Sequence, residues 1–259
     1  MPIIETGDAK LHYQIEGRPD APVLVLSNSL GTELGMWAPQ MPRLLEHFQV
    51  LRHDARGHGQ SQVTPGPYSI AQLAGDVIGL MDHLQIKRAH FCGLSMGGMI
   101  GMWLGAHHAS RIERLVLSNT AARIPPREAW NVRIDKVKLA GMAAIAEGVV
   151  ERWFTPGFAA REPQQIDRAR AMLLHTSPAG YIANCAAVRD MDMRDDLVAI
   201  RAPTLVIAGS QDKATPPHDG EFVAQQIAGA RFLELDAAHL SNWEQADRFT
   251  TAVIDFLSA

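Results

Sequence analysis

The stretch Gly93-Leu94-Ser95-Met96-Gly97-Gly98 decides the fold, because it places a Gly-x-Ser-x-Gly pattern between a β-rich run, Ala89–Cys92, and an apolar helical run, Gly97–Ala106. A turn this tight leaves no room for flanking side chains, so glycine stands on both sides of the serine. The serine is then held in a strained backbone conformation, with its hydroxyl above the end of the strand. This pattern predicts an activated serine nucleophile, Ser95, at a strand-to-helix turn.

Short β-rich runs alternate with helical patterns on both sides of this turn. The runs of strand length are Val23–Leu26, Gln49–Arg52, Ala89–Cys92, Arg114–Leu117, Thr204–Ile207 and Phe232–Leu235. Apolar residues at helical spacing lie between most of these runs, as in Ile70–Leu84, and again over Asp247–Leu257. Because such alternation is typical of a parallel sheet covered on both faces, we predict an α/β fold with a mostly parallel central sheet. We expect Leu11–Ile15 to form an antiparallel edge strand.

The alternation stops in the middle of the chain, where no convincing strand occurs. Helical runs, including Lys136–Val150 and Pro163–Leu174, fill this part and are separated by turns that contain proline. We therefore predict a core made of residues 1–122 and 200–259, with residues 123–199 inserted as a helical cap. A chain of 259 residues is long enough for one large core plus this insertion.

The serine needs a base, and the base needs a carboxylate to orient it, because a serine hydroxyl is a weak nucleophile. In folds with this turn the expected chain order is serine, acid, histidine. His239 is the candidate base, since its loop follows the last predicted strand and can return over the serine. Asp212 is the candidate acid, since it closely follows the preceding strand. The other position for the acid, Ser118-Asn119-Thr120, holds no carboxylate, which favours Asp212.

Two backbone N–H groups are expected to stabilise an oxyanion beside Ser95. One belongs to Met96, which follows the serine at the start of a helix. The other belongs to Leu30, in the loop after the strand Val23–Leu26.

The loop Asp54-Ala55-Arg56-Gly57-His58-Gly59-Gln60-Ser61 also gathers polar side chains. Two glycines among polar side chains are typical of a turn that hydrogen-bonds to itself. We therefore expect Asp54, Arg56 and His58 to brace loops beside the serine; the alternative is a catalytic role for His58.

Composition argues against several classes of function. A net charge of −4 with scattered Lys and Arg offers no basic stripe, so we expect no nucleic-acid partner. The most apolar stretch, Gly97–Ala106, has about half the length that a membrane span requires. The first residues do not resemble a secretory signal, and Cys92 and Cys185 fit reduced thiols, so a cytoplasmic location is expected. His and Cys show no metal-ligand spacing, and no metal or organic cofactor is expected. Nothing in these residues predicts an oligomeric state.

Several motifs together resemble the α/β-hydrolase superfamily over essentially the whole chain: the Ser95 turn, the Asp-x-Arg-Gly-His-Gly-x-Ser loop, Gly-Ser-Gln-Asp and Ala-Ala-His. More narrowly, Asn28-Ser29-Leu30-Gly31-Thr32, Trp130-Asn131-Val132-Arg133-Ile134 and the serine turn resemble 3-oxoadipate enol-lactonases. The resemblance implies hydrolysis of 3-oxoadipate enol-lactone to 3-oxoadipate through a Ser-His-Asp acyl-enzyme mechanism. That reaction belongs to the bacterial β-ketoadipate pathway of aromatic catabolism.

The implied substrate is a small lactone with a carboxylate, which a protein of net negative charge must meet with a local cation. The cap holds several arginines: Arg123, Arg127, Arg133 and Arg152. We expect Arg133 to bind the carboxylate, because it lies in the segment that resembles the lactonases, and Trp130 and Trp153 to wall the pocket. The alternative for any one of these residues is a solvated position on a helix.

Other functions remain open for the same catalytic residues. A carboxylesterase, a carbon–carbon bond hydrolase of aromatic degradation or a cofactor-free perhydrolase would differ only in the cap and the loops. Haloalkane dehalogenases and epoxide hydrolases are disfavoured, because they are expected to carry Asp where Ser95 stands. A ligand receptor on the same scaffold is a hypothesis of another class, and slow turnover of a lactone would distinguish it.

Overall fold

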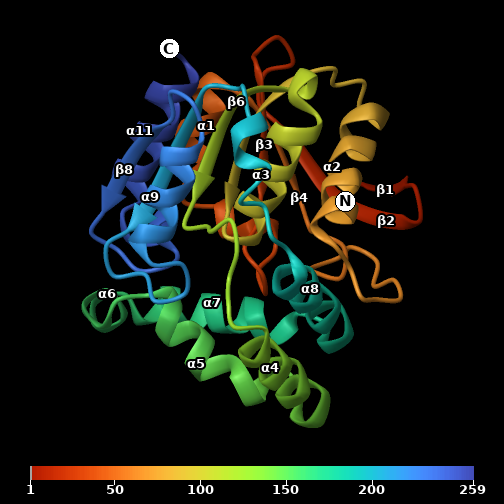
Figure 1. The fold of residues 1–259 in the computed structure, drawn as a ribbon, viewed down its shortest axis with the longest axis vertical. Coiled ribbons are helices and arrows are strands. Elements are labelled where there is room, and N and C mark those ends of the chain that lie inside the picture. Colours follow the sequence, from red (N-terminus) through yellow and green to blue (C-terminus); the bar gives the residue numbers. More distant parts are fainter. Residues whose placement is uncertain (1) are drawn as a thin grey trace.

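The computed structural model describes residues 2–259, and its strands form one sheet in the order β1-β2-β4-β3-β5-β6-β7-β8 (Figure 1). The strands are β1 (Ile3–Thr6), β2 (Ala9–Glu16), β3 (Val23–Ser27), β4 (Gln49–His53), β5 (Ala89–Leu94), β6 (Ile112–Ser118), β7 (Thr204–Gly209) and β8 (Arg231–Leu235). Only the pairs β1–β2 and β2–β4 are antiparallel. The predicted α/β fold with a mostly parallel sheet is confirmed.

One strand differs from the prediction. The expected edge strand at residues 11–15 is β2, and it does not lie at the edge, because β1 pairs along its outer side. The two strands are joined by a tight turn at Gly7, whose φ of 61° suits glycine. With four residues, β1 is too short to give a clear alternating pattern in the sequence.

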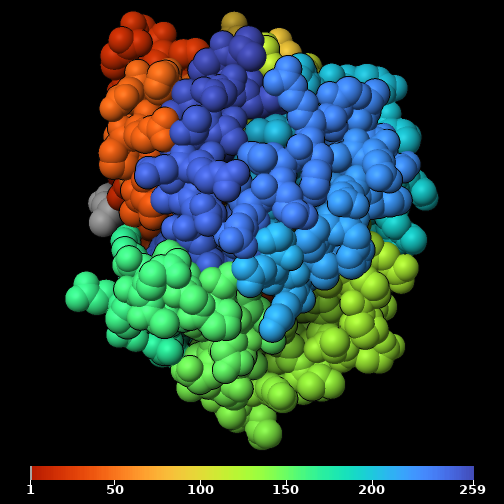
Figure 2. Space-filling model, turned by 90° about the vertical axis from the view of Figure 1, so that its left-hand side faces the viewer, coloured from red at the N-terminus to blue at the C-terminus, as the bar shows by residue number. Residues whose placement is uncertain are grey.

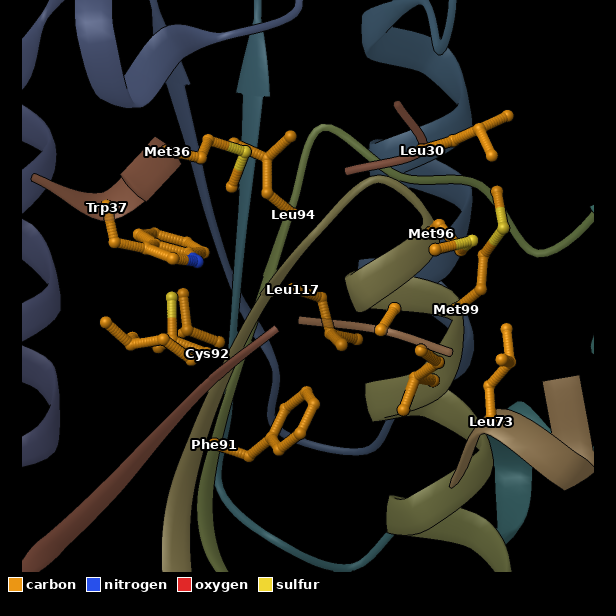
Figure 3. Close-up of a cluster of buried hydrophobic side chains, with 14 of the residues drawn as sticks. Leu30, Met36, Trp37, Leu73, Phe91, Cys92, Leu94, Met96, Met99 and Leu117 are labelled. Carbon is orange, nitrogen blue, oxygen red and sulfur yellow. The ribbon is translucent and has the colours of Figure 1, made fainter. Parts of the chain in front are cut away.

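The helices of the chain cover both faces of the sheet and one of its ends. They are α1 (Met41–His47), α2 (Ile70–His83), α3 (Met96–His107), α4 (Arg127–Ala140), α5 (Ala143–Trp153), α6 (Pro156–Arg161), α7 (Pro163–His175), α8 (Pro178–Asp190), α9 (Pro217–Gln226), α10 (Ser241–Glu244) and α11 (Ala246–Leu257). Helix α1 contacts α11, whereas α2 contacts α3. Figure 3 shows Trp37 and Cys92 on one side of the central strands, and Met96, Met99 and Leu73 on the other. These apolar layers fix the positions of the strand ends.

Helices α4 to α8 lie between β6 and β7 in the chain and gather at one end of the sheet (Figure 1). Figure 2 shows this green segment packed against the blue C-terminal part of the chain. The predicted single helical run Lys136–Val150 is wrong, because α4 ends where Gly141 adopts a φ of 69°, and α5 begins at Ala143. The limits of the cap, residues 123–199, stay a prediction.

Candidate active site

Ser95 occupies the turn between β5 and α3. Its φ of 59° and ψ of −114° lie in a region that is strained for a residue with a side chain, as predicted. A Cβ at Gly93 would overlap the carbonyl oxygen of Gly97, and a Cβ at Gly97 would overlap that of Ser27. Backbone bonds hold the turn, since Ser95 donates its N–H to the carbonyl of Ser118 at 2.8 Å. The strain is therefore maintained by close packing of backbone on backbone.

Asp212 and His239 meet beside this turn. They lie in the loops after β7 and β8, and because these strands are parallel neighbours their loops emerge together at one edge. His239 Nδ1 lies 2.7 Å from Asp212 Oδ2, and both side chains are buried. With Nδ1 bonded to the carboxylate, Nε2 is the ring nitrogen left for proton transfer.

Hydrogen-bond donors surround the carboxylate of Asp212. Oδ1 accepts from the N–H groups of Ala214 at 2.7 Å and Thr215 at 3.0 Å, and Oδ2 accepts from the Thr215 hydroxyl at 2.8 Å. Burial opposes ionisation, but the charge and hydrogen bond of His239, with the bonds from Thr215 and Asn119, hold the pKa of Asp212 below its usual value. The carboxylate is therefore ionised and fixed in place at neutral pH.

Asn119 is a residue that the sequence reasoning passed over. It stands at the alternative position for the acid, after β6, with a φ of 45°. Its Nδ2 donates to Asp212 Oδ2 and to the carbonyl of Ala238, both at 3.1 Å. Its Oδ1 accepts from the hydroxyl of Ser241 at 2.6 Å. Asn119 thus joins the acid loop to the histidine loop.

The two predicted oxyanion donors come from different segments, Leu30 from the loop after β3 and Met96 from the first residue of α3. Within the described residues, neither the N–H of Leu30 nor that of Met96 has a hydrogen-bond acceptor, and Leu30 lines the same pocket as Ser95. The next residue, Gly31, donates its N–H to Nε2 of His58 at 2.9 Å. The positions fit the predicted roles, which remain predictions.

The loop after β4 braces its surroundings through hydrogen bonds, as predicted. Asp54 accepts from the N–H of Leu34 at 2.8 Å and contacts His12 Nδ1 at 2.7 Å. Arg56 is buried and forms an ion pair with Asp76 at 2.6 Å. Burial lowers the pKa of His58 to about 4, which keeps its Nε2 free to accept from Gly31.

A pocket of about 270 Å³ joins these core residues to the cap. Ser95 and His239 lie on its core wall, and Trp130, Arg133 and Trp153 lie on its cap wall, so the structure brings these five of the predicted site residues together. The volume is close to the lower limit for small-molecule sites. The Arg133 guanidinium stacks 4.6 Å from the centre of the Trp130 ring.

The cap wall carries cations without carboxylate partners. Arg133 and Arg152 are half-buried and line the pocket, yet neither forms an ion pair within the described residues. Five other cap arginines do pair with Asp or Glu: Arg123, Arg127, Arg170, Arg189 and Arg194. Burial and the nearby charge of Arg133 lower the pKa of Arg152. An anion between the two guanidinium groups would relieve this repulsion.

Comparison with known proteins identifies the family. The family described as serine aminopeptidase, S33, matches residues 17–235. The chain is 43% identical to 3-oxoadipate enol-lactonase 2 of Acinetobacter baylyi over 95% of this chain and 92% of that protein. The crystal structure of the enol-lactonase from Burkholderia xenovorans LB400 is 52% identical, covers 100% of both chains and has a TM-score of 0.98. The chain belongs to the 3-oxoadipate enol-lactonase family of α/β-hydrolases. The resemblance drawn from the motifs is confirmed.

A third similar protein is named as an esterase and not as an enol-lactonase. A thermophilic esterase from Thermogutta terrifontis, solved with malate bound, is 31% identical, covers 99% of this chain and 97% of that one, and has a TM-score of 0.92. The same scaffold therefore also occurs in proteins named as esterases.

Three further residues of the pocket wall in this enol-lactonase family member were not predicted as site residues from the sequence: Arg152, Tyr181 and Lys213. Arg152 was one candidate among several cap arginines, and no periodic pattern distinguishes it. Tyr181 lies on α8, and burial raises the pKa of its hydroxyl. Lys213 follows Asp212 directly, so its position next to the acid was the one available signal.

Within residues 2–259, this family member shows neither a metal-binding cluster nor a membrane-spanning helix. No group of three or more His, Cys, Asp or Glu side chains is placed to hold a metal ion. None of the helices in this range has the length and hydropathy that a membrane crossing requires.

Proposed function

We propose that this protein hydrolyses 3-oxoadipate enol-lactone to 3-oxoadipate. The observation that carries the proposal is the pocket in which Ser95 and His239 face two half-buried arginines that have no ion pair within residues 2–259. In a lactone with a carboxylate side chain, the carbonyl would meet Ser95 on the core wall and the carboxylate would meet the arginines on the cap wall. The enol-lactonase names of the relatives at 43% and 52% identity support the same substrate.

The chemistry follows from the core wall. Asp212 orients His239, whose Nε2 removes the proton of the Ser95 hydroxyl as Oγ adds to the lactone carbonyl. The N–H groups of Leu30 and Met96 stabilise the oxyanion. The ring C–O bond then breaks, and the enol oxygen leaves with the proton from His239, giving an acyl-enzyme on Ser95. The enol tautomerises to a ketone, and water activated by His239 releases the acid.

The cap wall binds the substrate in this proposal. Arg133 holds the carboxylate, and Arg152, on the same wall, supplies a second positive charge. The Arg133 guanidinium lies 4.6 Å from the centre of the Trp130 ring, and this stacking holds the guanidinium in one orientation. Trp153 encloses the lactone ring. No metal or organic cofactor takes part.

The division of the chain belongs to the same proposal. We infer a core of residues 1–122 and 200–259 that supplies the reacting groups, and a cap of residues 123–199 that supplies substrate recognition. The cytoplasm, where aromatic catabolism provides such a lactone, is the proposed location.

The direct test is hydrolysis of freshly generated enol-lactone, followed by its loss of absorbance, with wild type and Ser95→Ala. Wild type should turn over many times per second, and Ser95→Ala should lose at least about 1000-fold of that rate. No hydrolysis by folded wild type would reject this substrate, and slow single turnover would favour a receptor.

A general carboxylesterase is the second candidate, because the Thermogutta terrifontis esterase shares 31% identity and a TM-score of 0.92. A neutral ester of similar size separates the two candidates. An esterase should hydrolyse it as well as the lactone, whereas a lactonase that depends on Arg133 should prefer the anionic substrate.

A further inference from the structure

The histidine loop is tied to the cap through one side chain, Glu244. This residue closes α10, five residues after His239, and its carboxylate is half-buried. Its Oε1 accepts the N–H of Ala238, the residue directly before His239, at 2.8 Å. Glu244 therefore sets the backbone from which the imidazole projects.

The same carboxylate also binds the cap. Oε1 accepts the N–H of Thr155 at 3.1 Å, and Oε2 accepts the Thr155 hydroxyl at 2.6 Å. The Thr155 hydroxyl in turn accepts from the N–H of Phe158 and caps α6. Glu244 thus receives three hydrogen bonds, and charge-assisted bonds of this kind are stronger than neutral ones.

A second bond joins the two segments on the other side of the histidine. Leu240, directly after His239, donates its N–H to the carbonyl of Trp153 at 2.9 Å. The residues before and after the histidine are therefore both linked to the segment from Trp153 to Thr155, Ala238 through Glu244 and Leu240 directly. This segment directly follows Arg152 and begins with Trp153, both of which line the pocket. The two segments belong to the green and blue regions that meet in Figure 2.

We propose that Glu244 is a positioning residue that, through Thr155, couples the substrate-binding wall of the cap to the alignment of His239. Asp212 holds the imidazole ring at Nδ1, whereas Glu244 holds the backbone that carries it. A substrate that orders the cap thereby also orders the base. The inference rests on the proposed role of His239, but it does not depend on which acyl substrate is cleaved.

The test compares Glu244→Gln, Thr155→Val and Thr155→Ser with a matched control, Glu147→Gln. Glu147 is an exposed cap carboxylate paired with Arg170 at 2.9 Å, and within residues 2–259 it forms no hydrogen bond or ion pair with the histidine loop. Glu244→Gln replaces one acceptor oxygen by a donor, Thr155→Val removes the hydroxyl, and Thr155→Ser keeps it. The rate of Ser95 labelling by a fluorophosphonate is measured first, since it reports the activated serine without any lactone. The Michaelis parameters for the lactone follow.

We expect Glu244→Gln to lower both the labelling rate and kcat about 10- to 100-fold, with KM changed less than about threefold. Thr155→Val should lower both by a smaller factor, Thr155→Ser should restore them, and Glu147→Gln should match wild type. The effects of Glu244→Gln and Thr155→Val should not be additive in the double variant, because they break one link.

The low-field proton resonance of the His239–Asp212 hydrogen bond supplies a signature that a purely structural role would leave unchanged. It should broaden in Glu244→Gln and persist in Thr155→Ser. Labelling and kcat within twofold of wild type in folded Glu244→Gln would overturn the inference, as would loss of activity through KM alone. If the lactone is not the substrate, labelling still decides the question. If Glu244→Gln does not fold, Thr155→Val and Thr155→Ser decide it by the same measurements.

Discussion

The two walls of the pocket are built in opposite ways. Behind the core wall, Asp212 accepts bonds from His239, Thr215 and Asn119, so its charge is fully satisfied before any ligand arrives. On the cap wall, Arg133 and Arg152 are half-buried and form no ion pair within residues 2–259. In the proposed function, the reacting groups are therefore preorganised, whereas the two arginines are placed to receive a group of opposite charge. Substitutions of the groups on the core side should lower kcat, and substitutions of residues on the cap wall should raise KM.

The largest effect is expected at the core wall from Asp212→Asn. The amide cannot hold His239 in the tautomer that accepts the serine proton, so kcat should fall about 10⁴-fold with little change in KM. Steady-state kinetics with the lactone measure both constants. Asp255→Asn, an exposed change on α11, is the control. A fall of less than tenfold would remove Asp212 from its proposed role.

A second prediction concerns pH and the loop that carries Leu30. Burial lowers the pKa of His58 from 6.5 to about 4, so between these pH values the unfolded chain binds more protons than the folded protein. The free energy of unfolding should therefore decrease as the pH falls from 6.5 to 4, with a His58 contribution on the order of 3 kcal/mol. Gln does not titrate, so the free energy of unfolding of His58→Gln should decrease less steeply as the pH falls. Urea unfolding at each pH measures this free energy.

The control for this prediction is His83→Gln, an exposed change at the end of α2. It should keep the pH dependence of wild type. An equally steep decrease in His58→Gln and wild type would mean that other groups carry the effect.

At the cap wall, Arg133→Ala should raise KM for the lactone about 10- to 100-fold while kcat changes little, because one charge-assisted contact is lost. Hydrolysis of a neutral ester should be unaffected. Arg127→Ala is the matched control, since Arg127 already pairs with Asp190 at 2.6 Å. An unchanged KM for Arg133→Ala would leave Arg152 as the carboxylate anchor.

The smallest effect is expected from Trp130→Phe. Phenylalanine keeps the apolar wall but attracts the Arg133 guanidinium less strongly than the indole does, so KM should rise only about two- to fivefold. Trp103→Phe is the control, because Trp103 packs on His107 and His108, away from the pocket. A change in kcat rather than KM would place Trp130 with the core wall instead.

Much of the core wall could be predicted from the sequence, because local patterns determine it. A strand, a glycine-flanked serine and an apolar helix leave one backbone geometry for Ser95, and the end of each parallel strand lies at the same edge of the sheet. Asp212 and His239 could therefore be chosen by their place after a strand. The break between α4 and α5 was missed, because a single glycine at 141 does not interrupt an apolar pattern.

The sequence by itself determined the fold class and the family, and it predicted the chain positions of the candidate serine, acid and histidine, since each depends on residues close together in the chain. Only the tertiary structure decided which cap cations face the pocket and which pair elsewhere, because Arg127 and Arg133 share one helix and differ in what approaches them. It also decided the contacts of Asn119 and Glu244, whose partners come from other segments of the fold. The structure brings Asn119 against Asp212, 93 positions away, and Glu244 against Thr155, 89 positions away.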